Sequence, residues 1–111
     1  VLTTSRTFLN EHRGAVVRYL RTLVDASQWA DGHRAEAAEL IARECGFDDT
    51  AIDRFVGPDL DGKMMPRFES SMNRSLQQAV DLLHQLGFTN RAFRVEDWID
   101  HTPLNEAIGR A

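Results

Sequence analysis

Four histidines, at positions 12, 33, 84 and 101, are the first side chains in this chain that could do chemistry. Two histidines that bind one metal ion from the same helix stand three or four residues apart, so that both rings share a face. No two histidines here have that spacing. His12, His33 and His101 fall at the ends of expected helices, where a cationic ring interacts favourably with terminal carbonyl groups. We therefore predict structural histidines and no metal site.

Cys45 is the single cysteine, which excludes an internal disulfide and a thiolate metal cluster. A cysteine nucleophile is normally activated at a helix N-terminus, where the helix dipole lowers the thiol pKa. Cys45 instead ends an expected helix, directly before Gly46. We predict a small buried apolar side chain with no catalytic role.

The run Gly57-Pro58-Asp59-Leu60-Asp61-Gly62 places two carboxylates in a loop that contains glycine. A calcium-binding loop needs more acidic positions over twelve residues and a terminal glutamate. The run lacks both, and we predict a solvated loop.

Arg67 could bind an anion through its planar guanidinium, but it could equally cap the end of the third expected helix, which runs through Phe55, or pair with Glu69. Trp29 and Trp98 could stack on a ligand, but their helical apolar positions favour a place in the core. A phosphate-binding glycine loop, a Ser-His-Asp arrangement and a paired-carboxylate signature are all missing from the sequence. We predict that the chain carries no catalytic residue and no cofactor, and it offers no residue to which ligand binding can be assigned.

The 111 residues suit one domain, and the hydrophobic share of 42% and charged share of 27% are typical of a globular protein. The net charge is −4, and the basic residues are scattered among acidic ones. Because the chain offers no basic stripe to a phosphate backbone, we expect no nucleic-acid partner. No apolar run is long enough to span a bilayer.

The strongest helical pattern runs from about Arg13 to Asp31. Its apolar side recurs at three- and four-residue steps through Val16, Leu20, Leu23, Val24, Ser27 and Ala30. The opposite side, which we expect to face water, carries Arg18, Arg21, Asp25 and Gln28. Gly32 stands where a left-handed glycine would end this helix.

Short elements flank this helix at its N-terminal side. Residues 1–4 (Val-Leu-Thr-Thr) are compatible with the end of a strand, whose neighbours would have to lie in sequence before Val1. Ser5 is the expected N-cap of a short helix that ends near His12 and uses Phe8 and Leu9 as apolar contacts.

A second helix is expected from about Ala35 to Cys45, closed by Gly46. Asp48 or Asp49 then caps a short helix through Phe55, with an apolar patch formed by Ala51, Ile52 and Phe55. Gly57 to Pro66 contains two glycines and two prolines, and we predict a loop held by the packing of Met64 and Met65.

Another long helix begins at Ser70 or Ser71 and ends at Gly87. Its apolar face carries Met72, Leu76, Ala79, Val80 and Leu83. In the tail we expect one or two helical turns over Val95 to Ile99, anchored by Trp98. Thr102 caps a final turn, and Pro103 occupies its first position, where proline is well tolerated.

The order of these features carries a family resemblance. Ser5 to His12 (SRTFLNEH) leads into a helix that ends at Trp29-Ala30-Asp31, and an alanine-rich helix follows from Ala35 to Gly46. Next come Met65-Pro66-Arg67-Phe68, Ala79 to Phe88 (AVDLLHQLGF), Val95 to Asp100 (VEDWID) and Pro103 to Ala107 (PLNEA). The chain resembles, over essentially its whole length, the C-terminal part of the solute-binding proteins of ABC importers for nitrate, sulfonate, taurine and thiamine precursors. It departs from them at Arg13 and Arg34, where family members often carry proline.

This resemblance implies a two-lobed α/β parent, like the periplasmic binding proteins, with a ligand cleft between its lobes. Residues 1–111 would form a single, mainly α C-terminal segment, made of the end of a strand and closing helices, with Thr3 and Thr4 near the hinge. The implied function is capture of a small organic anion or related molecule, of the sulfonate, nitrate, taurine or pyrimidine type. The implied partner is an importer permease, and the implied location is the periplasm or cell envelope.

Two alternatives stay open. Aromatic sulfinate desulfinases and pyrimidine-precursor synthases are cytoplasmic enzymes on the same scaffold. The desulfinases look similar over this stretch, including the Pro66-Arg67 pair and a tail tryptophan. Their nucleophilic cysteine would precede Val1, so Cys45 would not take its place. The second alternative is a stand-alone helical interaction module. The first two hypotheses need the apolar stripes at 16–30 and 72–83 to rest on a β-layer supplied by other sequence.

Overall fold

Polar caps and left-handed glycines define many of the helix ends in the computed structural model, which describes residues 2–55, 57–58 and 60–109. Val1 and Asp59 lie outside the described residues. So do the side chains of Asp49, Phe55 and Asp61, and with them the parts of the predicted cap, apolar patch and acidic loop that depend on those groups.

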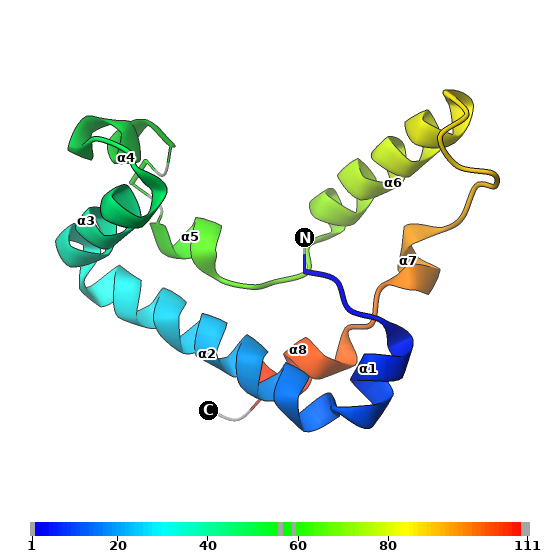
Figure 1. Ribbon diagram of the computed structural model, residues 1–111, viewed down its shortest axis with the longest axis horizontal. Coiled ribbons are helices and arrows are strands. Elements are labelled where there is room, and N and C mark those ends of the chain that lie inside the picture. Colours follow the sequence, from blue (N-terminus) through cyan, green and yellow to red (C-terminus); the bar gives the residue numbers. More distant parts are fainter. Residues whose placement is uncertain (1, 56, 59, 110–111) are drawn as a thin grey trace.

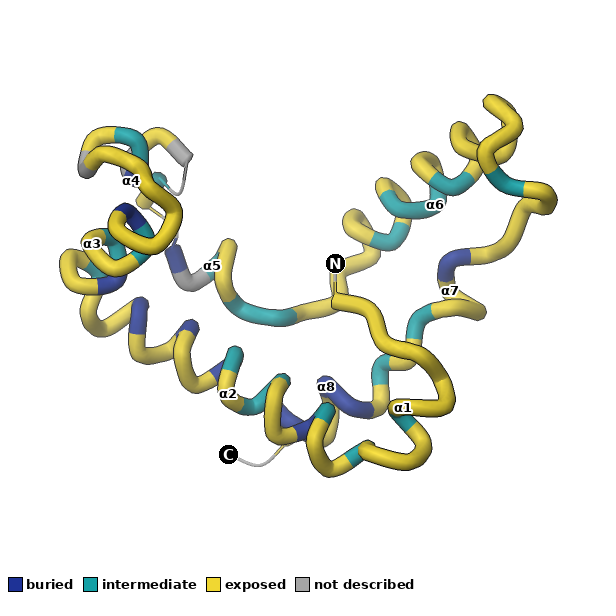
Figure 2. The backbone as a smooth tube through the Cα atoms, in the orientation of Figure 1, coloured by how far each residue is buried: buried dark blue, intermediate teal, exposed yellow. Residues whose placement is uncertain are grey.

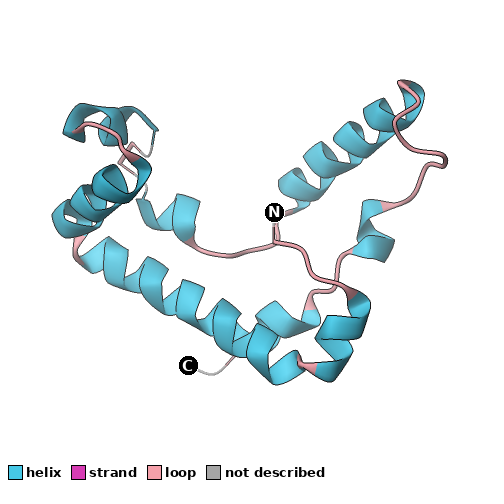
Figure 3. Cartoon of the chain, viewed as in Figure 1, coloured by secondary structure: helices cyan, strands magenta, loops and turns pink. Residues whose placement is uncertain are grey.

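Helices dominate the chain (Figures 1 and 3). In order they are α1 (Arg6–Glu11), α2 (Arg13–Gly32), α3 (Arg34–Cys45), α4 (Asp49–Phe55), α5 (Leu60–Met64), α6 (Ser70–Gln85), α7 (Val95–Trp98) and α8 (Thr102–Ile108). Over the described ranges there is no strand, which confirms the mainly helical class. In the same ranges, no helix is both long and apolar enough to cross a membrane.

The N-terminal prediction is confirmed at the start of α1. Ser5 Oγ accepts a hydrogen bond from the Phe8 amide at 3.1 Å, which satisfies one of the free amides of the first turn. Leu2, Thr3 and Thr4 lie in no regular element and have no strand beside them in the described chain.

The predicted left-handed end at Gly32 is wrong. Gly32 is the last residue of α2, and the turn is made by His33, whose φ is −131°. The His33 amide donates to Ala30 O, and its Nδ1 hydrogen-bonds to Trp29 O at 2.9 Å. Because α3 begins at the next residue, one residue makes the whole connection and leaves no room for a left-handed cap.

Two other glycines do end their helices as predicted. Gly46 has φ +69° after α3, and Gly87 has φ +79° after α6. Beyond each glycine the next amide reaches back to a helix carbonyl: Phe47 N to Ala42 O, and Phe88 N to Leu83 O. This is the Schellman arrangement, which uses glycine because a side chain is strained at positive φ.

The predicted caps downstream are partly confirmed. Asp48 caps α4, since its Oδ1 accepts from the Ala51 amide at 2.8 Å. α6 begins at Ser70, as expected. At α8 the expected cap is wrong: Thr102 is the first helical residue, and the capping group is the carboxylate of Asp100, which accepts from Thr102 N at 2.9 Å. Pro103 is buried in the first turn of α8.

The loop predicted for Gly57 to Pro66 contains α5 instead. Leu60 is 3% exposed and forms a small core with Ala30 and Ala37, against which Ile41 packs. This burial outweighs the low helix propensity of the glycine within α5, a preference that tertiary packing routinely overrides. Met64 is exposed and Met65 half-buried, so the expected pinning by both methionines applies only to Met65.

The helices form an open arc rather than a closed bundle (Figure 1). α2 packs against α8 and α5, α3 packs against α4, and α6 packs against α7. α3 and α4 stand at one end of the arc and α6 at the other. Buried residues are confined mainly to the α2–α8 region and the α2–α3–α5 corner, and α6 has none (Figure 2).

The open shape leaves much more surface exposed than a compact single domain of the same size would expose. The radius of gyration is 16.8 Å, against about 13 Å for a compact chain of this length. The accessible surface is 8401 Å², whereas a compact monomer of this mass exposes about 6,200 Å². The excess is about 2,200 Å², as large as the area covered in a permanent interface.

Candidate functional site

Each of the four histidines touches an aromatic ring or a main-chain carbonyl. The ring centroids of Phe8 and His12 lie 4.8 Å apart, those of Trp29 and His33 lie 4.8 Å apart in a stack, and those of Phe68 and His101 lie 4.3 Å apart. His84 Nδ1 hydrogen-bonds to Thr89 O at 3.1 Å. His101 immediately precedes α8, so the favourable interaction expected at a helix C-terminus does not apply to it.

The described residues contain no group of three histidine, cysteine or acidic side chains that could hold a metal ion. This finding does not cover the acidic loop prediction, because Asp59 and the side chain of Asp61 lie outside the described residues.

Cys45 is exposed, so the prediction of a buried apolar side chain is wrong. It is the last residue of α3, and the chain turns away at Gly46 without covering it. Its place at a helix C-terminus provides none of the dipole stabilisation that a reactive thiolate uses.

Arg67 takes one of the structural alternatives that the sequence left open, the pair with Glu69, and the carbonyl that it also reaches belongs to α5 and not to the helix end that it was expected to cap. Its Nε lies 2.8 Å from Glu69 Oε1, and its Nη2 donates to the carbonyl oxygen of Gly62 in α5. The two interactions tie the segment between α5 and α6 to α5 and to the start of α6. Its side chain therefore has protein partners already.

The tryptophans are exposed, contrary to the prediction of core anchors. Trp98 is 53% exposed and touches Phe93, with ring centroids 6.4 Å apart. The residue that anchors α7 is Val95, which is 2% exposed. Trp29 is 40% exposed and stacks on His33.

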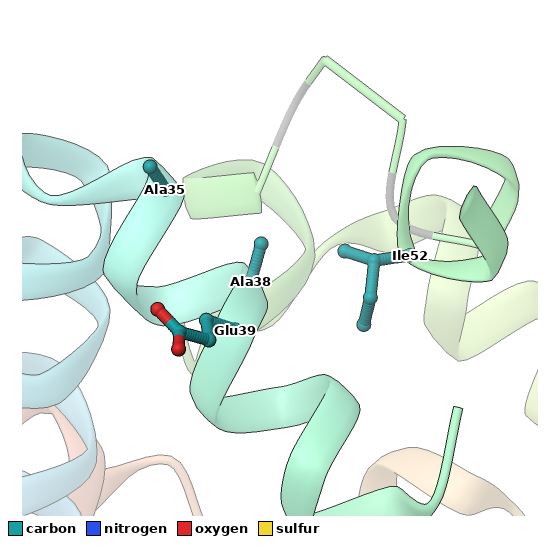
Figure 4. Close-up of a pocket in the computed structure, with 4 residues that line it drawn as sticks. All are labelled: Ala35, Ala38, Glu39 and Ile52. Carbon is teal, nitrogen blue, oxygen red and sulfur yellow. The ribbon is translucent and has the colours of Figure 1, made fainter. Parts of the chain in front are cut away.

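One open hollow, of about 320 Å³, lies between α3 and α4 and is lined by Ala35, Ala38, Glu39 and Ile52. Figure 4 shows Ala38 and Ile52 on its two sides and the Glu39 carboxylate turned away from Ile52. Alanine and isoleucine walls without converging polar groups provide no means of orienting a substrate.

A second open hollow, of about 360 Å³, lies between α6 and α7. Its lining residues are Ser70, Asn73, Arg74, Gln77, Arg94, Val95 and Glu96. Gln77 organises this region: its Oε1 accepts from Val95 N at 2.8 Å, and its Nε2 donates to Phe93 O at 3.1 Å. Arg94 is already paired with Glu96 at 3.1 Å. The hollow is thus a polar surface groove in which Gln77 fixes α7 on α6.

Among the described side chains, two carboxylates have lowered pKa values, and both are helix caps. The pKa of Asp48 is lowered by the hydrogen bonds from the Thr50 side chain and the Ala51 amide. The pKa of Asp100 is lowered by the Thr102 hydroxyl, then by the Thr102 amide, with smaller contributions from Arg13 and Arg6. A carboxylate that accepts hydrogen bonds in this way is kept ionised, which suits a cap and not a general acid.

Several long-range polar contacts could not be predicted from the sequence, because their partners are distant in the chain. Arg13 at the start of α2 contacts Glu106 in α8 at 3.1 Å. Arg34 at the start of α3 donates through Nη1 to Pro58 O at 2.9 Å and through Nη2 to Gly57 O. The only signal in the sequence was that Arg13 and Arg34 stand where the proteins that the chain resembles often carry proline.

The chain can be aligned over nearly its whole length with characterised enzymes. The relatives are 2′-hydroxybiphenyl-2-sulfinate desulfinases from Rhodococcus erythropolis, Rhodococcus qingshengii and Rhodococcus erythropolis strain XP. Each is 24% identical over 110 residues, which is 99% of this chain and 30% of the relative. The chain is similar to sulfinate desulfinases.

The similarity favours the enzyme alternative over the importer component. The chain spans about a third of the length of these desulfinases, so their whole activity does not transfer to it directly. No family model and no solved structure matches the chain. The importer and its permease therefore stay predictions.

Proposed function

We propose that this chain is the C-terminal helical part of a larger enzyme that removes the sulfinate group from an aromatic sulfinate. The observation that carries the proposal is the alignment of 110 residues of this chain with the desulfinases, which covers 30% of the length of those enzymes. As in the prediction from sequence, the chain is a C-terminal segment of a larger protein. The proposed function of that protein is desulfination instead of solute capture.

The proposed reaction consumes one water. The bond between the ring carbon and sulfur breaks, a proton takes the place of sulfur on the ring, and the sulfinate leaves with the water oxygen as hydrogensulfite. Such a reaction needs a proton donor and a group that activates water or attacks sulfur. The described residues contain no group of three histidine, cysteine or acidic side chains that could hold a metal ion, and Cys45 is exposed at the C-terminal end of α3, so the proposal assigns the reacting groups to sequence outside residues 1–111.

The part played by this chain is to cover the rest of the enzyme. The excess surface of about 2,200 Å² is what a permanent interface requires. α6 supports this assignment because it is amphipathic yet has no buried residue. Met72 and Leu83, on its apolar face, are both 44% exposed. A helix with such a stripe is stable when another layer covers it.

The test is turnover by the polypeptide that the gene encodes, with 2′-hydroxybiphenyl-2-sulfinate as substrate. We expect release of equal amounts of 2-hydroxybiphenyl and sulfite, measured by chromatography and a sulfite assay. The matched variant Cys45→Ser keeps its kcat, because Cys45 is exposed at the end of α3. Binding of a sulfonate or of taurine without any turnover would instead support the importer prediction, and it would contradict the desulfinase proposal.

A further inference from the structure

Arg21 is a charged residue on the packing side of α2. It lies four residues after Val17 and three before Val24, so the three share a helical face. Val17 and Val24 are 3% and 7% exposed. Arg21 is half-buried, which corrects the expectation that it faces water. Its Nε is enclosed by protein and has no hydrogen-bond partner.

The carboxylates of the described chain do not neutralise this charge. Asp25, one turn further along α2, is exposed and makes no ion pair with Arg21 among the described residues. Glu106, in the helix that packs on α2, is engaged by Arg13. Arg21 therefore combines a partly desolvated guanidinium with the lack of a counter-charge.

This combination matters once the uncovered surface is covered. A guanidinium cannot be deprotonated in a protein, so full burial of Arg21 would leave a permanent charge in an apolar layer. Such burial is tolerated when a carboxylate accepts hydrogen bonds from the guanidinium, often through two of its nitrogens. Backbone carbonyls alone would satisfy the hydrogens without neutralising the charge.

We propose that Arg21 is the charged anchor of the interface between α2 and the remainder of the enzyme, and that its partner is a carboxylate outside residues 1–111. This inference rests on the proposed function, because it needs the covering layer. Val17 and Val24 are already buried within this chain, so the covering element meets α2 at the half-buried Arg21, beside that packed face, and the ion pair fixes its position along α2. Arg21 is thus a positioning residue of an interface, without contact to substrate.

The first arm of the test compares two arginines on one helix in the polypeptide that the gene encodes. Arg21→Met leaves the partner carboxylate buried and unpaired, and we expect the thermal midpoint to fall by about 3 °C or more. Arg18→Met is the matched control, since Arg18 is exposed, and its midpoint stays within about 1 °C. Equal midpoints for the two variants would overturn the proposal.

The second arm identifies the partner. In the Arg21→Lys variant a carbodiimide joins the new amine directly to a carboxylate that touches it, and mass spectrometry locates the linked peptide. We expect a link to an aspartate or glutamate outside residues 1–111. A link to Asp25 or Glu106 alone, or the lack of any link, would overturn the proposal.

The two proposals fail separately. If the wild type turns over the aryl sulfinate and Arg21→Met leaves the thermal midpoint unchanged, the anchor proposal is contradicted and the desulfinase proposal stands. If residue 21 is linked to a carboxylate outside residues 1–111 in a protein that shows no turnover, the anchor proposal stands and the desulfinase proposal is contradicted.

Discussion

Arg13 Nε lies 3.1 Å from Glu106 Oε2, so the first residue of α2 is tied to α8 across 93 positions of sequence. Arg13 Nη2 also donates to Thr102 Oγ1 at 3.1 Å, so one guanidinium contacts both turns of α8. Arg34 makes a comparable tie from the first residue of α3 to the Gly57 and Pro58 carbonyls. In this chain, the two positions where proline would only shape a helix start are used to join distant segments.

The tie between Arg13 and Glu106 contributes modestly to stability, because both side chains are about half exposed. Glu106→Gln should lower the free energy of unfolding by less than about 1 kcal/mol at low salt, and the loss should shrink at high salt. Denaturant titration of the encoded polypeptide at two salt concentrations measures both effects. Glu44→Gln is the control, because the Arg43–Glu44 pair is more exposed and joins adjacent residues. A larger loss for Glu44→Gln would contradict the argument.

The two glycine positions with different backbone geometry should respond in opposite directions to alanine. Gly87 has φ +79°, so Gly87→Ala should destabilise the protein by about 1 to 2 kcal/mol. Gly32 has helical geometry, and a methyl group there would meet no atom within 4 Å. Gly32→Ala should therefore stabilise by about 0.5 to 1 kcal/mol. Chemical denaturation of both variants measures these changes in the free energy of unfolding. Destabilisation by Gly32→Ala would instead support the left-handed cap predicted from the sequence.

Protonation of Asp100 should weaken the start of α8. Its pKa is lowered in the folded state, chiefly by the Thr102 hydroxyl, so its contribution to stability is complete above the unfolded pKa of about 3.9 and is lost as the pH falls through the folded value. Asp100→Ala should thus lower the thermal midpoint at pH 7 and have little effect near pH 2. The difference in midpoint between variant and wild type, followed from pH 7 to pH 2, measures this. A difference independent of pH would contradict the assignment.

Local signals predicted the helix ends at Ser5, Gly46 and Gly87 correctly, because the interactions that make these ends are local. Ser5 binds an amide three residues away, and Gly46 acts through its own φ angle. The misses at Gly32 and Thr102 are also local, since His33 makes the one turn and Asp100 the other cap. The missed helix α5 depends on distant partners. α5 forms because Leu60 finds Ala30 and Ala37, which the intervening glycines and prolines do not reveal.

The candidate site follows the same rule. The expectation that the histidines share no site rests on their spacing alone, and it stays a prediction. The burial of the side chains could not be predicted. Cys45 and Trp98 are exposed in this chain, whereas helical periodicity indicates only that a side chain is suited to burial.

The uncovered apolar side chains predict how residues 1–111 behave when they are expressed alone. Leu86 and Phe88 are 62% and 76% exposed at the end of α6, and such clusters bind apolar dyes. We expect the isolated segment to bind 1-anilinonaphthalene-8-sulfonate and to melt over a broad range, whereas the encoded polypeptide binds little dye and melts sharply. A sharp melt without dye binding by the segment would support the stand-alone module.

A pair of variants locates the dye site. Phe88→Ser should reduce dye binding by the isolated segment, because it removes the most exposed large apolar side chain at the end of α6. In the encoded polypeptide the same change should lower the thermal midpoint, since the proposed cover loses its contact there. Gln78→Ala, on the polar side of α6, is the control and should change neither quantity. Equal effects of the two substitutions would mean that the end of α6 faces solvent in the complete protein as well.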